Sequence, residues 1–509
     1  MAGEHRSGRI IGVTKSVCPQ CLRVISAEKV VRDQGIFLEK TCPEHGTYAA
    51  LIWEGTEDSY RAWGANIQPA DQITQAAPAD QGCPFDCGLC KDHERKGCCV
   101  LLEVTDRCKL HCPVCFARAG EREGRDVPIE ELGRQMEYLM SHGGPFNLQI
   151  SGGEPTMRDD LPEIIRMGKE KGFSFFQLNT NGLRLAEEPG YGESLRAAGL
   201  SCVFLQFDGV RDEVYRILRG RPLFQKKCAA IDACKRAGLG VILVPVLTPG
   251  VNEDQVGEIL EYAVSRMPVV RGVHFQPVSY FGRCLEAQGS YRFTIPKILK
   301  LMEEQTGGRI LGDHFTGGNA TNPYCTFQAN YLRQEDGTLV PMLHGTARAY
   351  ATSEQAREFV ARQWAGPEDV GGCGEEPKGP YDCRSEPENS CCCSVPQSEN
   401  VCSGESEDDC MCCCDVKGPA EAEESPGDNC CCCGGSTAQM QLDVSSLDEF
   451  LLKLHNNTFA ISGMLFQDSF NLDLERLRRC YILETDSRYG MVPFCAYNLT
   501  NLGGKTLYR

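Results

Sequence analysis

The sequence contains no run that approaches about 18 consecutive apolar residues, the length that a membrane-spanning helix needs. Its first residues, MAGEHRSGRIIGVTKS, also lack the apolar core of a secretory signal. Both absences predict a cytoplasmic chain without a transmembrane segment.

Positive charge is scarce as well. The 509 residues carry 52 Lys or Arg against 70 Asp or Glu, a formal net charge of -18. Residues 367–435 hold 17 acidic and only 3 basic side chains, so this segment alone accounts for -14. The remainder is close to neutral, and without a basic patch it predicts no nucleic-acid partner.

Cysteine, in contrast, is abundant, with 32 residues. Cytoplasmic thiols stay reduced, so closely spaced cysteines there are typical of metal ligands and not of disulfides. Fourteen of them fall in the segment 366–438, in runs such as CCC and CCCC within acidic, Gly- and Pro-containing sequence. This low-complexity insert cannot bury a core. Its cysteines either wrap soft metal ions or belong to a solvated loop without a catalytic role, and both interpretations stay open.

Short apolar runs alternate with amphipathic stretches between residues 98 and 305. The six runs are CVLLEVT, FNLQIS, FSFFQLN, CVFLQFD, GVILVPV and GVHFQPV, separated by stretches such as VPIEELGRQMEYLM and LPEIIRMGKEK. The alternation predicts parallel strands joined by right-handed crossovers, hence an α/β barrel or an open doubly wound sheet. Such folds place their chemistry at the C-terminal ends of the strands.

The flanking regions differ from this part in composition. Residues 1–65 carry CPQC and CPEHG, and residues 66–97 form a link that ends in GCPFDCGLC. We expect a cap in two parts, 306–365 and 439–509, on either side of the insert. The stretch LDEFLLKLHNNTFAISGMLFQDSFNLDLERLRRCYIL in the second part has a helical pattern and precedes the ending MVPFCAYNL.

Three cysteines follow the first apolar run directly. TDRCKLHCPVCFA places Cys108, Cys112 and Cys115 at C-x3-C-x2-C. Thiolates at this spacing can converge on one face of a 4Fe-4S cluster and leave its fourth iron open. With Phe116 and a glycine-rich strand end downstream, the trio resembles the radical S-adenosylmethionine (SAM) superfamily. The resemblance implies that SAM binds the open iron and that its reductive cleavage releases a 5'-deoxyadenosyl radical. A zinc knuckle that borrows a fourth cysteine is the alternative.

Polar residues end the second and third runs. In SGGEP, Gly152 and Gly153 let the backbone approach a ligand closely, and Glu154 offers an acceptor for an ammonium group. By resemblance, this motif binds the methionine amine of SAM. In LNTNG, Asn179 and Asn181 are expected either to hydrogen-bond the cofactor or to form an Asn-Gly turn.

The fourth and sixth runs end in polar residues at the same predicted rim. Gln206 and Asp208 end the fourth run, and Gln276 ends the sixth. Their positions make them candidates for the cofactor pocket.

Two further metal sites are predicted before the barrel. Cys83, Cys87 and Cys90 repeat the C-x3-C-x2-C spacing, and Cys98 follows as a fourth ligand, with Cys99 as its rival. Four ligands imply a complete auxiliary 4Fe-4S cluster, with zinc as the alternative. Nearer the N-terminus, a knuckle suits zinc or a mononuclear iron, and its ligands are Cys18, Cys21, Cys42 and His45.

A narrower resemblance covers about residues 1–345 and 440–509. It rests on the block GCPFDCGLCKDHERKGCCVLLEVTDRCKLHCPVCFA, the N-terminal knuckles and the ending PFCAYNL. These look like the radical SAM family that contains archaeal tetraether lipid synthase and the methylases of 7,8-dihydro-6-hydroxymethylpterin. The resemblance implies several metallocofactors and a partial (β/α)6 barrel between an N-terminal metal knuckle and a C-terminal cluster-binding cap.

Three cysteines remain for a cluster in the C-terminal region, namely Cys325, Cys480 and Cys495. The family pattern has another cysteine shortly before NPYC, where this chain has Ala320. The fourth ligand is therefore open between His314, His344, an insert cysteine and the substrate.

The function predicted is hydrogen abstraction from an unactivated carbon, followed by methyl transfer or carbon-carbon bond formation on a pterin-like or lipid substrate. A low-potential donor such as ferredoxin or flavodoxin is the expected partner. A maturase that modifies a peptide is one alternative. A non-enzymatic metal-handling protein is another, but it leaves SGGEP and LNTNG at the strand ends unexplained.

Overall fold

The computed structural model describes residues 8–65, 70–71, 78–121, 124–284, 292–318, 322–342, 353–366 and 444–509. They belong to one compact unit, residues 1–369 and 449–509, except for 444–448, which belong to a second unit, 370–448. The predicted insert 366–438 lies outside the described residues, apart from Gly366.

The N-terminal region is a four-stranded antiparallel sheet followed by one helix. Its elements are β1 (Arg9–Val17), β2 (Val24–Arg32), β3 (Gly35–Cys42), β4 (Gly46–Trp53) and α1 (Glu57–Trp63). Thr56 caps α1 by accepting a hydrogen bond from the Ser59 N–H. The turns β1–β2 and β3–β4 carry the CPQC and CPEHG motifs, so adjacent hairpins of one sheet supply both knuckle pairs.

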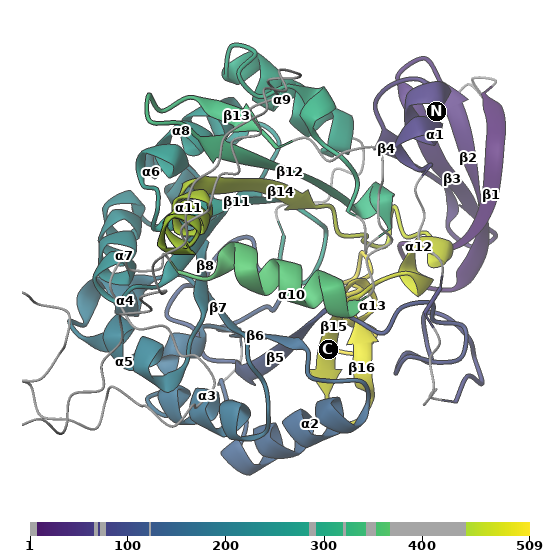
Figure 1. The fold of residues 1–509 in the computed structure, drawn as a ribbon. Helices are drawn as coiled ribbons and strands as arrows, with labels where there is room; N and C mark the ends of the chain where they lie inside the picture. Colours follow the sequence, from purple (N-terminus) through teal and green to yellow (C-terminus); the bar gives the residue numbers. More distant parts are fainter. Residues whose placement is uncertain are drawn as a thin grey trace, which may run out of the picture. The chain divides into compact units, whose positions relative to one another are not determined.

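The centre of the fold contains the six predicted parallel strands, side by side in chain order (Figure 1). They are β5 (Cys99–Thr105), β6 (Asn147–Gly152), β7 (Phe176–Thr180), β8 (Cys202–Gln206), β9 (Gly240–Val244) and β11 (Val270–Pro277), with the short β10 (Val246–Leu247) beside β11. The helices are α2 (Ile129–Ser141), α3 (Leu161–Glu170), α4 (Leu183–Glu187), α5 (Tyr191–Ala198), α6 (Asp212–Arg219), α7 (Phe224–Arg236), α8 (Val256–Ser265) and α9 (Ile295–Gln305). Short 3-10 turns are η1 (Pro155–Met157), η2 (Glu253–Gln255), η3 (Gly312–His314) and η4 (Pro323–Cys325). The partial (β/α)6 barrel is confirmed.

The C-terminal region predicted as a cap adds strands to both edges of this sheet. Beyond β11 lie β14 (Thr458–Met464), β12 (Thr326–Arg333) and β13 (Leu339–Pro341), and beyond β5 lie β15 (Ile482–Asp486) and β16 (Gly490–Pro493). The two short helices of this region are α12 (Leu474–Arg478) and α13 (Phe494–Tyr497).

The helical pattern predicted from about residue 440 is wrong for the residues directly after Asn457, although α12 lies further along the same stretch. Helix α11 (Val444–Asn457) ends there, and the following TFAISGM forms β14. This strand pairs in parallel with β11 and antiparallel with β12, so it is covered on both edges. Its near-continuous apolar sequence is that of a strand buried on both faces, which periodicity alone does not separate from a buried helix.

The two faces of the parallel strands have different roles. Val100 and Leu102 of β5 join the core beneath the outer helices, whereas Cys99 faces the interior cavity. Helix α10 (Ser353–Trp364) lies across that interior (Figure 1). Buried Arg357 of α10 donates hydrogen bonds to the carbonyls of Gly97, Gly143 and Pro145, in the segments that enter β5 and β6. The helix therefore closes the N-terminal end of the barrel and leaves the C-terminal end to the cysteine loop.

Among the described residues, no helix is long and apolar enough to cross a bilayer.

Candidate active site

The predicted cysteine trio lies in the loop after β5. Cys112 is buried with Leu110, Leu183, Tyr215 and Leu223, and Cys108 and Cys115 pack against the same apolar patch. Burial raises the pKa of the Cys108 thiol to about 12 and also raises that of Cys112. A bound metal would remove these protons, and the Leu110 N–H already points at the Cys108 sulfur at 3.4 Å. The three thiols thus fit a buried iron-sulfur cluster.

Two arginines hold this loop by its carbonyl oxygens. Arg219 of α6 donates to the Val114 carbonyl at 3.0 Å. Arg283 donates to the Cys112 carbonyl at 2.6 Å and exchanges two backbone hydrogen bonds with Cys115, at 2.7 and 3.0 Å. Sequence reasoning missed both arginines, because each is an isolated residue more than a hundred positions from the loop.

The glycines of SGGEP lie against the backbone of the chain that enters the cysteine loop. Gly152 has φ 123°, and a Cβ there would lie 2.3 Å from the Thr105 carbonyl oxygen. A Cβ on Gly153 would lie 2.4 Å from the Arg107 carbonyl oxygen. Both glycines are therefore required for the strand end to pack against the chain that enters the cysteine loop. An additional contact with a ligand stays a prediction.

Glu154 joins the ends of β6 and β7. Its carboxylate is buried and accepts hydrogen bonds from the Thr156 and Thr180 hydroxyls, at 2.7 and 2.6 Å, and from the Asn181 N–H at 2.7 Å. Four donors to one carboxylate, counting the Thr156 N–H, keep it fixed beside the trio. Its predicted role as the acceptor for the methionine amine is compatible with this position and stays a prediction.

The two asparagines of LNTNG differ in their surroundings. Asn181 accepts a hydrogen bond from the Leu183 N–H at 2.9 Å, and Gly182 has φ 78°, so this part is the Asn-Gly turn that sequence allowed. Asn179 instead faces the interior, where it accepts a hydrogen bond from Gln149 at 2.8 Å. Direct contact of either asparagine with the cofactor stays a prediction.

Gln206 and Asp208 belong to an internal polar network. Fully buried Asp208 receives a bidentate pair of hydrogen bonds from Arg219, at 2.8 and 2.7 Å, and contacts the Gln206 amide. Lys227 donates to Gln206 at 3.0 Å and to the Asn181 carbonyl at 2.6 Å. Burial lowers the pKa of the Lys227 amine to about 7. The observed partner of Asp208 is thus an arginine of the same network, and direct contact with SAM stays a prediction.

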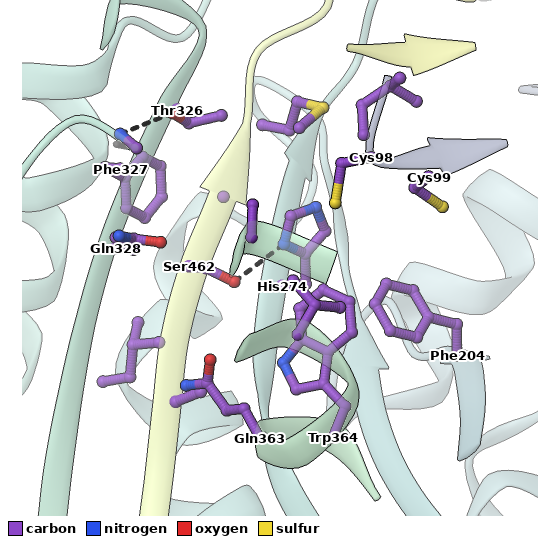
Figure 2. A pocket seen from close by; sticks show the side chains of 18 of the residues that line it. Cys98, Cys99, Phe204, His274, Thr326, Phe327, Gln328, Gln363, Trp364 and Ser462 are labelled. Carbon is purple, nitrogen blue, oxygen red and sulfur yellow. Dashed lines mark hydrogen bonds between the residues drawn. The ribbon is translucent and has the colours of Figure 1, made fainter. Parts of the chain in front are cut away.

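A cavity of about 410 Å³ occupies the interior between the strands and α10 (Figure 2). Its polar wall includes the neutral side chains Gln149, Gln177, Gln276, Gln328, Asn330 and Ser462. Arg362 is the sole Lys, Arg, Asp or Glu among the described residues that line it, and that side chain is 79% exposed. The rings of Phe204 and Trp364 pack against each other at a tilt, with centroids 4.8 Å apart and planes 59° apart. The cavity is therefore suited to an uncharged, flat ligand with hydrogen-bonding edges.

One histidine faces this cavity beside the two aromatic rings. His274 Nδ1 lies 2.9 Å from the Ser462 hydroxyl (Figure 2). Burial lowers the pKa of His274 to about 4, so its ring is uncharged at neutral pH.

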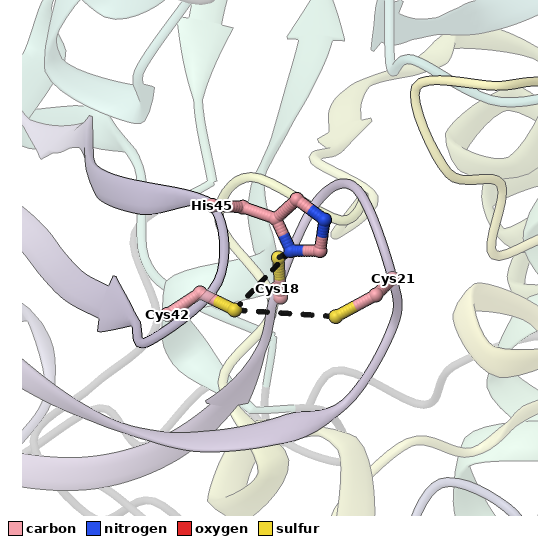
Figure 3. Close-up of side chains that lie close together, drawn as sticks. All are labelled: Cys18, Cys21, Cys42 and His45. Atoms are coloured by element: carbon pink, nitrogen blue, oxygen red, sulfur yellow. Dashed lines mark hydrogen bonds between the residues drawn. The ribbon is translucent and has the colours of Figure 1, made fainter.

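The N-terminal knuckle brings its four predicted ligands together (Figure 3). The ligand atoms of Cys18, Cys21, Cys42 and His45 all lie within 4.8 Å of one another, the one such group among the described residues. Burial raises the pKa of the Cys42 thiol, but hydrogen bonds from the Glu44 N–H and the His45 ring outweigh it and bring the pKa to about 6. A preformed thiolate within a Cys3His set fits a tetrahedral zinc ion.

The auxiliary cysteines are only partly brought together. Cys83, Cys87 and Cys90 line one small pocket of about 10 Å³ with His93. Cys98, the predicted fourth ligand, lines the interior cavity instead, as does its rival Cys99. Cys83, Cys87 and Cys90 therefore fit ligands of one metal group, and the role of Cys98 as its fourth ligand stays a prediction.

The C-terminal cysteines do meet. Cys325, Cys480 and Cys495 line a pocket of about 20 Å³, where Arg476 donates a hydrogen bond to the Cys325 sulfur at 3.1 Å. The Nε of buried Arg476 has no hydrogen-bond partner among the described residues, which leaves room for an acceptor. The three thiols therefore fit a cluster. Of the candidate fourth ligands, the His314 ring lies 3.0 Å from the Tyr331 hydroxyl, and His344 and the insert cysteines lie outside the described residues.

Comparison with known proteins assigns these features to a class. The profile of the radical SAM superfamily matches residues 102–263, and that of the HMPTM N-terminal zinc ribbon domain matches residues 10–54. The fold and the three-cysteine loop agree with both matches. The chain therefore contains a radical SAM domain and an N-terminal zinc ribbon domain.

Similarity over nearly the whole length defines the family. The chain is 34% identical over 500 residues to the 7,8-dihydro-6-hydroxymethylpterin dimethyltransferase of Methanocaldococcus jannaschii, with 95% of this chain and 93% of the relative covered. The chain belongs to the family of that enzyme and is a radical SAM enzyme of the methyltransferase type, which excludes the non-enzymatic metal-handling alternative.

Other relatives match less of the chain. A probable GTP 3',8-cyclase of Archaeoglobus fulgidus is 34% identical over 170 residues, which cover 33% of this chain and 54% of the cyclase. Among solved structures, Streptococcus suis SuiB bound to its precursor peptide overlaps 42% of this chain and 46% of its own, at 15% identity and a TM-score of 0.35. An overlap this small adds nothing to the assignment.

Proposed function

We propose that this enzyme methylates a neutral pterin, of the type of 7,8-dihydro-6-hydroxymethylpterin, in the interior cavity of the barrel. The observation that carries the proposal is the near full-length similarity to the Methanocaldococcus enzyme, which bears that substrate in its name. Overall, a carbon-hydrogen bond of the pterin is replaced by a carbon-carbon bond to the methyl group, the pterin loses that hydrogen, and the methyl donor is released without its methyl group.

The chemistry of the cavity wall supports a neutral heterocycle over a nucleotide triphosphate. GTP, the substrate in the name of the partial relatives, carries several negative charges and requires cationic partners. The described wall offers only the exposed Arg362. Its amides can instead both donate to and accept from a pterin edge, while Phe204 and Trp364 offer ring faces.

The cysteine loop is proposed as the cofactor site. Cys108, Cys112 and Cys115 would hold the 4Fe-4S cluster, and Glu154 and Asn179 would orient SAM at the neighbouring strand ends. When bound, the cluster and SAM supply the 5'-deoxyadenosyl radical. The buried side chains of Glu154, Asp208 and Lys227 are hydrogen-bonded at these strand ends and would keep them in place.

The remaining metal sites are proposed as zinc and auxiliary clusters. Zinc would occupy the Cys18, Cys21, Cys42 and His45 site, because its four ligand atoms already converge. One auxiliary 4Fe-4S cluster is proposed at Cys83, Cys87, Cys90 and Cys98, and a second at Cys325, Cys480 and Cys495. A ferredoxin or flavodoxin in the cytoplasm is the proposed electron donor.

The direct test is an anaerobic assay of the reconstituted enzyme with dithionite, SAM and 7,8-dihydro-6-hydroxymethylpterin. We expect mass spectrometry to detect a methylated pterin and more 5'-deoxyadenosine than in the assay without pterin. SAM labelled in its methyl group reports whether that methyl is the one transferred. Cys112→Ala is expected to abolish both products, whereas Cys234→Ala, which alters a buried core cysteine of α7, is expected to retain them.

A second arm replaces the pterin by GTP. We expect no increase in 5'-deoxyadenosine, because the cavity lacks a cationic cradle. Stimulation by GTP together with no response to the pterin would overturn the substrate assignment and leave the radical chemistry intact.

A further inference from the structure

A buried ion pair connects the barrel wall to the cysteine loop. Asp208, directly after β8, is fully buried, and Arg219, the last residue of α6, is 7% exposed. They share two hydrogen bonds, and a third bond runs from Arg219 to the Val114 carbonyl between Cys112 and Cys115. The pair thus ends on the loop that carries the three thiols.

The two charges of this pair lie at different distances from the loop. The guanidinium of Arg219 bonds to the loop and lies beside the Cys112 thiol, where it opposes the rise in pKa that burial causes. The carboxylate of Asp208 is bonded on its other side to the Val246 N–H at 3.3 Å and contacts Gln206. The positive end of the pair therefore faces the cysteines, and the negative end faces the barrel wall.

Burial makes this orientation electrostatically important. Charges in a protein interior are screened far less than charges in water. Reduction of an iron-sulfur cluster adds one negative charge, and potentials of such clusters depend on the charges and hydrogen bonds around their sulfurs. A fixed cation beside Cys112 stabilises the reduced form.

We propose that Arg219, oriented by Asp208, is a positioning residue that raises the reduction potential of the cluster held by Cys108, Cys112 and Cys115. It brings the cluster within reach of an external one-electron reductant, from which the cluster takes a single electron. The proposal rests on the assignment of these three thiols as cluster ligands, and it does not depend on the identity of the substrate.

The chain contains a matched control on the same loop. Arg283 also donates to the loop, at the Cys112 and Ala119 carbonyls, but its side chain is 23% exposed and pairs with Glu121 at 3.0 Å. Solvent screens its charge more strongly than it screens the buried guanidinium of Arg219. Arg283 therefore shares the loop-holding role of Arg219 without its buried, one-sided field.

The test is a redox titration of the reconstituted full-length enzyme, followed by electron paramagnetic resonance without substrate. The signal of interest is the one that changes when SAM is added and that disappears in Cys112→Ala. We expect Arg219→Gln to shift its midpoint to more negative potential and Asp208→Asn to shift it to more positive potential. Arg219→Lys, which retains the charge, is expected to stay nearer to the wild type than Arg219→Gln, and Arg283→Gln to leave the midpoint almost unchanged.

The opposite signs separate electrostatics from simple support of the loop. Shifts of equal sign in Arg219→Gln and Asp208→Asn, or no shift in either, would overturn the proposal. If Arg219→Gln does not hold its cluster, the midpoint potentials of Arg219→Lys and Asp208→Asn are compared instead. A midpoint potential in Asp208→Asn that is unchanged or more negative than in the wild type would contradict the proposal. Loss of the SAM-responsive signal in Cys112→Ala tests the assignment of the cluster ligands separately, because that loss is expected whether or not Arg219 changes the reduction potential.

Discussion

The ring of Tyr60, in α1 of the N-terminal region, stacks on the ring of Tyr324, next to Cys325, with centroids 4.3 Å apart and planes 17° apart. Tyr324 also donates a hydrogen bond to the Tyr60 carbonyl at 3.0 Å, and the Trp63 indole donates to the Pro323 carbonyl at 2.7 Å. These aromatic contacts and hydrogen bonds join the N-terminal region to the loop that carries Cys325.

Tyr324→Ala should therefore loosen this contact. We expect a loss of up to about 3 kcal/mol in the free energy of unfolding, the lower end of the usual cost of deleting a buried aromatic ring, because Tyr324 is only partly buried. Anaerobic urea denaturation measures it, and Tyr489→Ala, at a ring that is 39% exposed, is the control with little expected effect. Equal stability of the two variants would contradict a structural role for the stack.

Loss of one ligand should empty the N-terminal metal site. Cys21→Ser is expected to remove one equivalent of zinc per chain, because a three-ligand remnant binds zinc far more weakly. Elemental analysis of the purified variant measures both zinc and iron. Cys228→Ser, at a thiol outside any proposed site, should leave both unchanged. A fall in iron with zinc unchanged would identify the knuckle ion as iron.

The buried histidine of the cavity predicts a pH dependence of stability. Because the pKa of His274 is about 4 in the folded chain and about 6.5 when unfolded, the unfolded chain binds more protons between these values. Stability should hence be fully present above pH 6.5 and decline by up to about 3 kcal/mol as the pH falls toward 4. Denaturation curves at several pH values measure this slope, and His274→Gln should reduce it. An unchanged slope in that variant would assign the effect to other groups, such as buried His93, whose pKa is also about 4.

A charge placed in the cavity should impair substrate binding. Gln177→Glu puts a carboxylate on a wall whose one charged side chain among the described residues is the exposed Arg362, and Gln177→Met removes the amide without adding charge. We expect kcat/KM for the pterin to fall at least about tenfold more in the glutamate variant, because a buried carboxylate costs more than a lost neutral hydrogen bond. Steady-state kinetics decide the matter, and equal losses would show that charge is not the discriminating property.

Helix α10 should depend on a single side chain for its attachment. Arg357→Met removes the hydrogen bonds to three carbonyls and the guanidinium that lies 4.3 Å from the centre of the Phe146 ring, but it keeps much of the apolar stem. We expect faster amide hydrogen exchange in residues 353–364 than in the wild type, while exchange in β6 and β7 changes little. Arg362→Met, at an exposed position of the same helix, is the control. Protection that is equal in both variants would mean that apolar packing alone holds the helix.

Most of the features that the sequence predicts correctly depend on residues close together in the chain. The cysteine trio and the N-terminal knuckle are set by spacing within a few residues, and the six parallel strands by local alternation. The partners of those residues come from far along the chain. Nothing near Cys112 in the sequence indicates Arg219 or Arg283, and nothing near Asp208 indicates that its carboxylate is already paired. The glycines of SGGEP were recognisable as points of close approach, but only the pairing of β5 with β6 reveals that the approach is to the backbone at Thr105 and Arg107.

The position of β14 has a consequence for how the chain folds during synthesis. This strand lies between β11 and β12, although it is made long after both, and β15 likewise covers the open edge of β5. Until Thr458–Met464 leave the ribosome, a nascent chain exposes two unpaired edges of an apolar parallel sheet, the kind of edge that pairs with other chains. The segment from Thr458 onward therefore acts as the closing step of barrel assembly, and a truncated chain would be prone to aggregation before any cofactor could bind.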